Sequence, residues 1–282
     1  MEWLTSHKIP LGRWIEDGVD VVYEHSFWFF DAISTGLGFV IEGLIAILLW
    51  LPALLLIAMI AGLAFALHRN WRLPLLIVPA LLLVANMGYW EEMVETIALV
   101  LTSTAVCVLI GVPLGIAAAH RPWFQAGLRP VLDLMQTIPT FVYLIPTMVF
   151  FGLGVVPGLI STVVFAMPAP IRLTYLGVSG VPRELIEAGE AFGATPGQLL
   201  RKVELPYAMP AIMTGITQCI MLSLSMVVIA ALVGADGLGK EVVRALNSAD
   251  IARGFESGLA IVIVAILLDR ICKRADPGAG GR

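Results

Sequence analysis

Charged residues are scarce in this sequence. Only 13% of its 282 residues are Asp, Glu, Lys or Arg, whereas soluble domains carry about 25%. Hydrophobic residues make up 59% of the chain, and the mean hydropathy is +0.93. These values exclude an ordinary soluble domain. Backbone groups inside a bilayer must be satisfied internally, and an α-helix does this within one segment, so we predict an all-α integral membrane protein.

Motifs for catalysis and metal binding are also missing. The sequence has no Gly-x-x-x-x-Gly-Lys-Ser/Thr phosphate loop and no His-Glu-x-x-His. Cys107, Cys219 and Cys272 lack metal-ligand spacing, and we expect buried structural thiols. The net charge of −4 does not favour nucleic-acid binding. We therefore expect no metal site, no cofactor held by this chain and no ATP hydrolysis by it.

Apolar stretches recur along the chain, and about 20 residues suffice to cross about 30 Å of hydrocarbon. Charge-free stretches are Gly43–Leu67, Leu73–Trp90, Thr96–Ala119, Leu134–Ile171 and about Pro210–Val233. The turn-rich residues 152–158 divide the fourth stretch into two spans. Ser257–Leu268 is shorter, but a span there keeps the basic C-terminal tail on the side that the charge rule requires. We predict about seven transmembrane helices in one domain, residues 43–271.

The segments outside these spans indicate orientation. Residues 1–42 are rich in Asp and Glu and lack a compact apolar core, which argues against a cleavable signal peptide. We predict a retained extracytoplasmic tail that either lies at the membrane interface or packs against the bundle. Most of the 17 Lys and Arg residues fall in one alternating set of connections, which includes the tail 272–282. The positive-inside rule therefore places the N-terminus outside and the C-terminus in the cytoplasm.

A charged helix-turn-helix at residues 182–206 interrupts the apolar spans and must lie outside the bilayer, on the cytoplasmic side. Arg183–Ala191 is predicted to be a short helix that Gly193 ends. Thr195 as N-cap and Pro196 at the first helical position, with Gln198 three residues after the cap, predict a second helix. Pro206 and Pro210 are expected to mark its exit into the next span. The apolar face of the first helix is expected to contain Leu185, Ala188 and Phe192.

The spacing in this segment resembles the coupling loop of ABC-importer permeases, which reads Glu-Ala-Ala, three residues, Gly, nine residues, Ile-x-Leu-Pro. Gly189 replaces the second Ala and Val203 replaces Ile. An ordinary charged loop between two spans is the alternative. The residues that the resemblance implies for coupling to an ATPase are Glu184, Glu187, Ala188, Gly189, Glu190, Gly193, Ala194, Leu205 and Pro206.

Three further stretches, 133–146, 151–157 and 168–177, resemble the glycine betaine, proline and choline class of ABC permeases. The resemblance implies the type I importer permease fold in the bacterial inner membrane, and import of a quaternary or methylated ammonium compound by alternating access. It also implies two copies of an ATPase subunit that bind ATP and Mg²⁺, a second copy of this chain, surrounding lipid and a separate periplasmic binding protein. Histidine or another amino acid is the runner-up substrate.

Prolines and polar residues in the predicted spans are candidates for a translocation pathway. Proline frees backbone groups that only a protein interior or a water-lined cavity can satisfy, but helix packing and interhelical hydrogen bonds are equally open readings. The pathway candidates are Gln136, Thr137, Pro139, Thr140, Tyr143, Pro168 and Gln218. Candidates for docking a binding protein outside are Asp236, Lys240 and Arg244, although a solvated loop would carry the same charges.

Two other classes of membrane protein fit the sequence less well. An ion-coupled secondary transporter normally needs a charged residue near the bilayer midplane, and the predicted third to sixth spans contain none. An intramembrane enzyme needs a nucleophile and base or a metal cluster, and neither pattern is evident. Copurification with an ATPase would distinguish all three classes.

Overall fold

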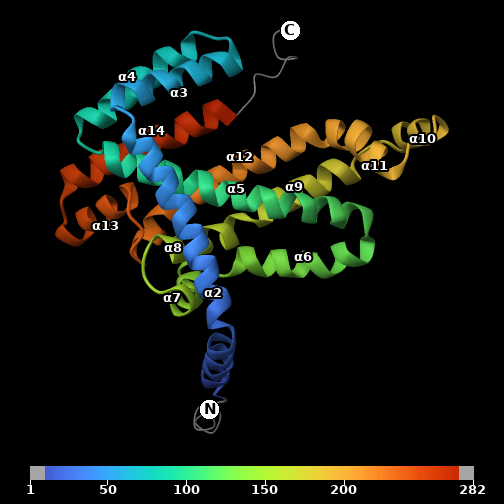
Figure 1. The fold of residues 1–282 in the computed structure, drawn as a ribbon, viewed down its shortest axis with the longest axis horizontal. Coiled ribbons are helices and arrows are strands. Elements are labelled where there is room, and N and C mark those ends of the chain that lie inside the picture. The colour runs from blue at the N-terminus through green and yellow to red at the C-terminus, as the bar shows by residue number, and fades with distance from the viewer. Residues whose placement is uncertain (1–9, 273–282) are drawn as a thin grey trace, which may run out of the picture.

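The computed structural model describes residues 10–272, and every element in this part of the chain is helical (Figure 1). The prediction of an all-α protein is confirmed. Residues 1–9 of the predicted N-terminal tail, and the predicted C-terminal tail after Cys272, lie outside the described residues. The elements are α2 (Leu11–Trp50), α3 (Ala53–His68), α4 (Arg72–Asn86), α5 (Trp90–His120), α6 (Pro122–Thr137), the 3-10 helix η1 (Thr140–Tyr143), α7 (Leu144–Phe151), α8 (Val155–Ala166), α9 (Pro168–Ser179), α10 (Arg183–Ala191), α11 (Pro196–Leu199), the π-helical turn η2 (Leu200–Glu204), α12 (Leu205–Ala231), α13 (Leu238–Ser248) and α14 (Ile251–Cys272).

Five helical stretches are long and apolar enough to cross a membrane, and the bent pair of α6 and η1–α7 is a sixth candidate. The last predicted span, 257–268, belongs to the 22-residue α14 and so has full spanning length. The two predicted spans in 43–90 correspond largely to α3 and α4, which have only 16 and 15 residues. These two helices are shorter than a straight crossing requires. The five long stretches are Gly12–Trp50, Trp90–His120, Val155–Ser179, Pro196–Ala231 and Ile251–Cys272.

The first predicted span, Gly43–Leu67, is divided in the structure. α2 passes through residue 43 without a break and ends at Trp50, and α3 begins at Ala53. Leu51 is extended, with ψ of 134°, because a residue that precedes proline is disfavoured in the helical conformation. The break therefore comes from Pro52 and not from the change in polarity near residue 42.

Helix α2 crosses α5 instead of running beside it (Figure 1). Its middle packs against the bundle: the rings of Phe30 and Phe150 stack with centroids 4.5 Å apart, and Ile41 is fully buried. Of the two predictions for the N-terminal tail, packing against the bundle therefore applies to this stretch. A position at the membrane interface stays a prediction for the rest of the tail.

The centre of the bundle is a close packing of α5, α9 and α12 at glycines. A Cβ on Gly115 of α5 would lie 2.7 Å from the carbonyl oxygen of Ile171 in α9. A Cβ on Gly177 of α9 would lie 2.9 Å from the Cβ of Ala211 in α12. Helices in lipid gain little from the hydrophobic effect, so small residues that permit close contact hold them together. The predicted coupling segment leaves from this centre, since α9 precedes it and α12 follows it.

The fourth predicted span, residues 134–151, is not one straight helix. α6 ends at Thr137 and η1 begins at Thr140, with the two parts bent by 106°. Ile138 is extended before Pro139, for the same steric reason as at Pro52. The helix is broken at Pro139, whereas Pro146 lies inside α7. The expected division at 152–158 is also present, because a turn separates α7 from α8.

Gly115→Ala should destabilise the bundle, because the new Cβ meets backbone, which cannot rotate away. Overpacking of this kind typically costs about 1–3 kcal/mol. We expect a lower midpoint when the purified protein is heated in detergent and its monodisperse fraction is measured by size-exclusion chromatography.

Gly127→Ala in α6 is the matched control, because a Cβ there meets nothing within 4 Å. This change should be neutral or stabilising, by up to about 1 kcal/mol from helix propensity. Equal midpoints for the two variants would contradict the close approach of α5 and α9.

Candidate functional site

The predicted coupling segment protrudes from one end of the bundle, and α13 lies at the opposite end (Figure 1). Helix α10 has the predicted bounds, Arg183–Ala191. Gly193 has a φ of 75°, a conformation in which glycine has no steric penalty. Its N–H donates to Glu190 O at 2.8 Å, and the N–H of Ala194 donates to Gly189 O at 3.1 Å. These two bonds form a Schellman cap, so the expected end of the helix at Gly193 is confirmed.

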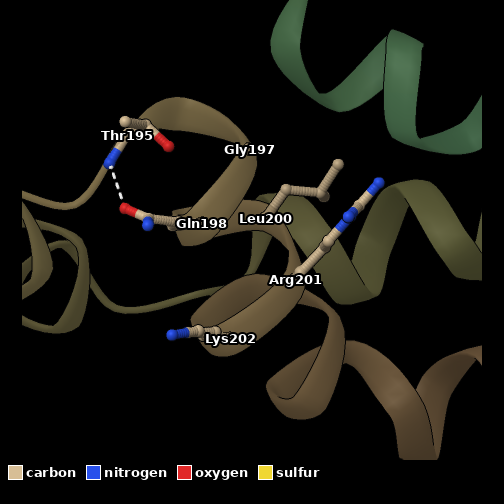
Figure 2. A pocket seen from close by; sticks show the side chains of 6 residues that line it. All are labelled: Thr195, Gly197, Gln198, Leu200, Arg201 and Lys202. Carbon is tan, nitrogen blue, oxygen red and sulfur yellow. Dashed lines mark hydrogen bonds between the residues drawn. The ribbon is translucent and has the colours of Figure 1, made fainter.

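The second helix begins as predicted. The backbone N–H of Thr195 donates to Oε1 of Gln198 at 2.9 Å (Figure 2), which is the glutamine half of a capping box. Pro196 occupies the first helical position, where its missing N–H costs nothing. The turn between α10 and α11 is therefore fixed by local hydrogen bonds on both sides.

Helix α10 packs against the second helix through a glycine. A Cβ on Gly189 would lie 2.5 Å from Cδ2 of Leu199, and Leu199 is buried. Gly189 is one of the two departures from the ABC-permease pattern, which has Ala there. Glycine therefore fits at position 189, because the missing methyl group leaves room for the Leu199 side chain.

The predicted apolar face of α10 points outward. Phe192 is 92% exposed and Leu185 is 45% exposed, and Ala188 is exposed as well. The inward side is formed instead by Gly189 and the half-buried Ile186. Glu184, Glu187 and Glu190 are also exposed. The tip of the segment therefore presents apolar and acidic side chains together, which is typical of a contact surface for another protein.

The expected exit of the second helix at Pro206 is not a helix end. The chain stays helical from Pro196 to Ala231, with the π-turn η2 in between. Pro206 has no N–H to donate and its ring crowds the carbonyl four residues earlier. The wider turn, in which Leu205 N–H donates to Leu200 O, lets the helix continue past this proline. We did not infer the π-turn from the sequence, although Pro206 was the residue that could have indicated it.

An open hollow of about 500 Å³ lies beside this turn (Figure 2). In the figure, the cationic groups of Arg201 and Lys202 point in different directions from η2. The hollow is lined by Thr195, Gly197, Gln198, Leu200, Arg201 and Lys202.

The pathway candidates centre on the bend between α6 and η1. Gln136, Thr137 and Pro139 are exposed. The hydroxyl of Tyr143 donates to the carbonyl oxygen of Met135 at 2.5 Å. This bond connects η1, after the bend, to α6, before it. Thr140 and Tyr143 are half-buried, Pro168 is buried at the start of α9, and Gln218 is exposed on α12.

A salt bridge that we did not infer ties the same region to α9. Arg172 Nη2 lies 2.6 Å from Asp133 Oδ1 of α6. Both side chains are more than a third exposed, so the pair contributes little to stability and mainly orients the two helices.

The docking candidates lie at the opposite end, at and just before α13. Lys240 is paired with Asp236, and Arg244 is paired with Glu241. The segment is firmly seated, because Leu238 N–H donates to Oγ1 of Thr96 in α5 at 2.9 Å. The candidate charges thus belong to two ion pairs on a fixed surface.

A family model described as "Binding-protein-dependent transport system inner membrane component" matches residues 111–278. The chain belongs to this family. The permease therefore has a multi-pass fold of the inner membrane, and the matched range includes the bend, the coupling segment and α13. Helices α2, α3 and α4 precede that range.

Curated relatives cover nearly the whole permease. The glycine betaine transport system permease protein OpuAB of Bacillus subtilis is 48% identical over 94% of this chain and 93% of its own length. The glycine betaine/carnitine transport permease protein GbuB of Listeria monocytogenes is 45% identical, over 93% and 94%. The glycine betaine/proline betaine permease protein ProW of Escherichia coli is 42% identical, over 96% and 81%.

A solved structure shares the fold. The permease resembles a chain of the MetNI methionine ABC transporter in an inward-facing conformation, with a TM-score of 0.59 and 25% identity over 64% of this chain and 90% of that chain. The prediction of the type I ABC importer permease fold is confirmed.

Gly193→Ala should loosen the coupling segment, since a side chain at φ of 75° is strained by about 1 kcal/mol or more. We expect faster amide hydrogen exchange in a peptide that covers residues 183–194. Gly197→Ala is the control, because Gly197 is helical and a Cβ there meets nothing within 4 Å. Unchanged exchange in Gly193→Ala would contradict the Schellman cap.

Proposed function

We propose that this permease imports glycine betaine or a closely related methylated ammonium compound, driven by separate ATPase subunits. The observation that carries the proposal is the 48% identity over 94% of the chain to a protein named as a glycine betaine permease. Relatives named for trimethylamine N-oxide are 40% identical over 72% and 65% of the chain. An amino acid such as histidine is the second candidate, and the 25% identity to a methionine transporter gives it weaker support.

The exposed tip of α10 is the proposed contact with the ATPase. Two ATPase copies, which bind ATP and Mg²⁺, would each receive one coupling segment. A short helix with an exposed Phe192 fits the helix-in-groove mode of recognition. The acidic side chains of Glu184, Glu187 and Glu190 would select a groove with a basic rim. Because the Schellman cap at Gly193 closes the C-terminal end of α10, the segment can transmit a rigid-body displacement.

A second copy of the permease is proposed to complete the translocation pathway. Gln136, Thr137 and Gln218 are exposed polar residues on α6 and α12. Polar groups at membrane depth are tolerated where they are buried in protein or line a water-filled cavity. Two copies that meet at the bend of α6 would bury Gln136 and Thr137 between them. The extended backbone at Pro139 would then contribute carbonyl groups to the pathway.

The opposite end is the proposed docking site of a separate binding protein. Asp236, Lys240 and Arg244 would lie outside and the N-terminus with them, while α10 would lie in the cytoplasm. The arrangement in Figure 1, with α10–α11 and α13 at opposite ends, supports this orientation. In the proposed cycle, ATP binding closes the ATPases, the coupling segments move, and the bundle opens outward to a loaded binding protein.

The ATPase activity of the reconstituted complex should respond to substrate in the presence of its binding protein. We expect stimulation by one of glycine betaine, choline, carnitine or trimethylamine oxide. Glu187→Lys should abolish this stimulation, because it reverses a charge on the exposed face of α10. Stimulation by histidine alone would contradict the proposed substrate class, and absence of any associated ATPase would contradict the proposed mechanism.

Phe192→Ala should weaken ATPase binding without unfolding the permease. The side chain is 92% exposed, so its loss should change folding stability by no more than about 0.5 kcal/mol. Buried aromatic anchors typically contribute 2 kcal/mol or more to an interface, so copurification of the ATPase should fall at least about tenfold.

Phe255→Ala is the matched control, because Phe255 is 70% exposed near the start of α14. This variant should retain the ATPase. Equal retention in both variants would show that Phe192 is not part of the contact.

A further inference from the structure

A buried carboxylate lies where the coupling segment joins the bundle. Glu204 is the last residue of η2 and is only 7% exposed. Its Oε2 lies 2.9 Å from Nε2 of His120, the last residue of α5. The contact has the distance of an ion pair without the alignment of a hydrogen bond, and Oε2 has no other partner in the described part of the chain. A protonated His120 would therefore compensate the charge of Glu204 where solvent does not.

The histidine ring faces an oxygen on each side. Its Nδ1 lies 2.9 Å from the carbonyl oxygen of Ile116, and its Nε2 faces the carboxylate. A neutral imidazole carries one N–H, so it would turn a lone pair toward one of these two oxygens. The imidazolium ion has an N–H on both nitrogens and suits both neighbours. The positions of the two oxygens therefore suit an imidazolium ion beside a carboxylate.

The pair connects two parts of the permease that no other described ion pair joins. α10, α11 and η2 lead directly into α12, and α5 belongs to the packed centre of the bundle. With the pair intact, η2 is held to the end of α5 as well as to α12. With the pair broken, the π-turn could deform when α10 is displaced, and less of the displacement would reach α5. Such turns are local irregularities in a helix and are often found at functional sites.

We propose that His120, as an imidazolium ion, is a positioning residue for ATPase coupling that fixes η2 to α5 through Glu204. Histidine changes its charge near physiological pH, and the His120 side chain is 46% exposed, so protons from the cytoplasm reach it. Coupling is therefore strongest at lower cytoplasmic pH and declines as the pH rises. This inference rests on the proposed coupling function of the segment.

The other charged groups near this point belong to the elements that meet there. Arg121 follows His120 in the chain, and η2 contributes Arg201 and Lys202. Glu204 is the carboxylate that faces the imidazole ring. The remaining titratable or charged groups on the neighbouring parts of α9, α10 and α12 are Arg172, Tyr175, Arg183, Glu184, Glu187, Glu190 and Tyr207.

The test uses the full complex in proteoliposomes, with ATPase and binding protein, at a constant external pH. Substrate uptake per ATP hydrolysed is measured while the pH on the ATPase side is varied from 6.5 to 8.5. We expect the wild-type ratio to fall about fivefold as the histidine loses its proton. His120→Arg, with a permanent cation, should keep a high ratio at pH 8.5. His120→Gln and Glu204→Gln should give a low ratio at every pH.

His25→Gln is the matched control. His25 makes the same kind of Nδ1 contact, 2.9 Å from the carbonyl oxygen of Val21, and is exposed on α2. This variant should retain the wild-type pH profile. A His120→Gln profile that parallels the wild type, or an Arg variant that falls with pH as the wild type does, would overturn the proposal. Failure of the wild-type complex to couple ATP hydrolysis to uptake at any pH would instead contradict the proposed function, and with it this inference.

Discussion

The contact between backbones at Gly115 and Gly177 is the constraint on which the rest of the permease depends. It brings α5, α9 and α12 within a separation at which a single methyl group would collide. Hydrophobic residues on these helices face lipid as readily as protein, so shape rather than polarity holds the centre together. The coupling segment connects α9 to α12, and Glu204 near its end pairs with His120 at the end of α5. A displacement of that segment therefore acts on all three packed helices.

Prolines determine where this helical architecture departs from straight spans. Pro52 and Pro139 each force the preceding residue into an extended conformation, and a helix ends there. Pro206 has a different outcome, because the π-turn before it absorbs the steric conflict and the helix continues. The difference follows from the surroundings. η2 is held by Glu204 and the buried Leu199, whereas the residues on both sides of Pro139 are largely exposed.

The sequence predicted best the features that nearby residues determine. The bounds of α10, the cap at Gly193 and the start at Thr195 depend on hydrogen bonds within six residues or fewer, and all were correct. The direction of the apolar face of α10 was not predictable in this way. The periodicity predicts that Leu185 and Phe192 face the core. In the structure Gly189 faces inward instead, because Leu199 occupies the space beside it. The His120–Glu204 pair was missed because it joins residues distant in sequence that only the packing of α5 against α12 brings together.

In the coupling segment, the residues that fix the backbone differ from those that form the exposed surface. The proposed transmission requires that α10 move as a body, and the hydrogen bonds that close its C-terminal end and the start of α11 do not depend on a partner. Recognition requires exposed side chains, and those of Phe192 and Glu187 contribute nothing visible to the fold of the single chain. Under the proposed coupling role, changes at the exposed positions should alter which ATPase is bound, whereas changes at Gly193, Leu199 or Glu204 should alter how much of the ATPase movement reaches α5 and α12. A segment in which one residue served both purposes could not vary its partner without losing its rigidity.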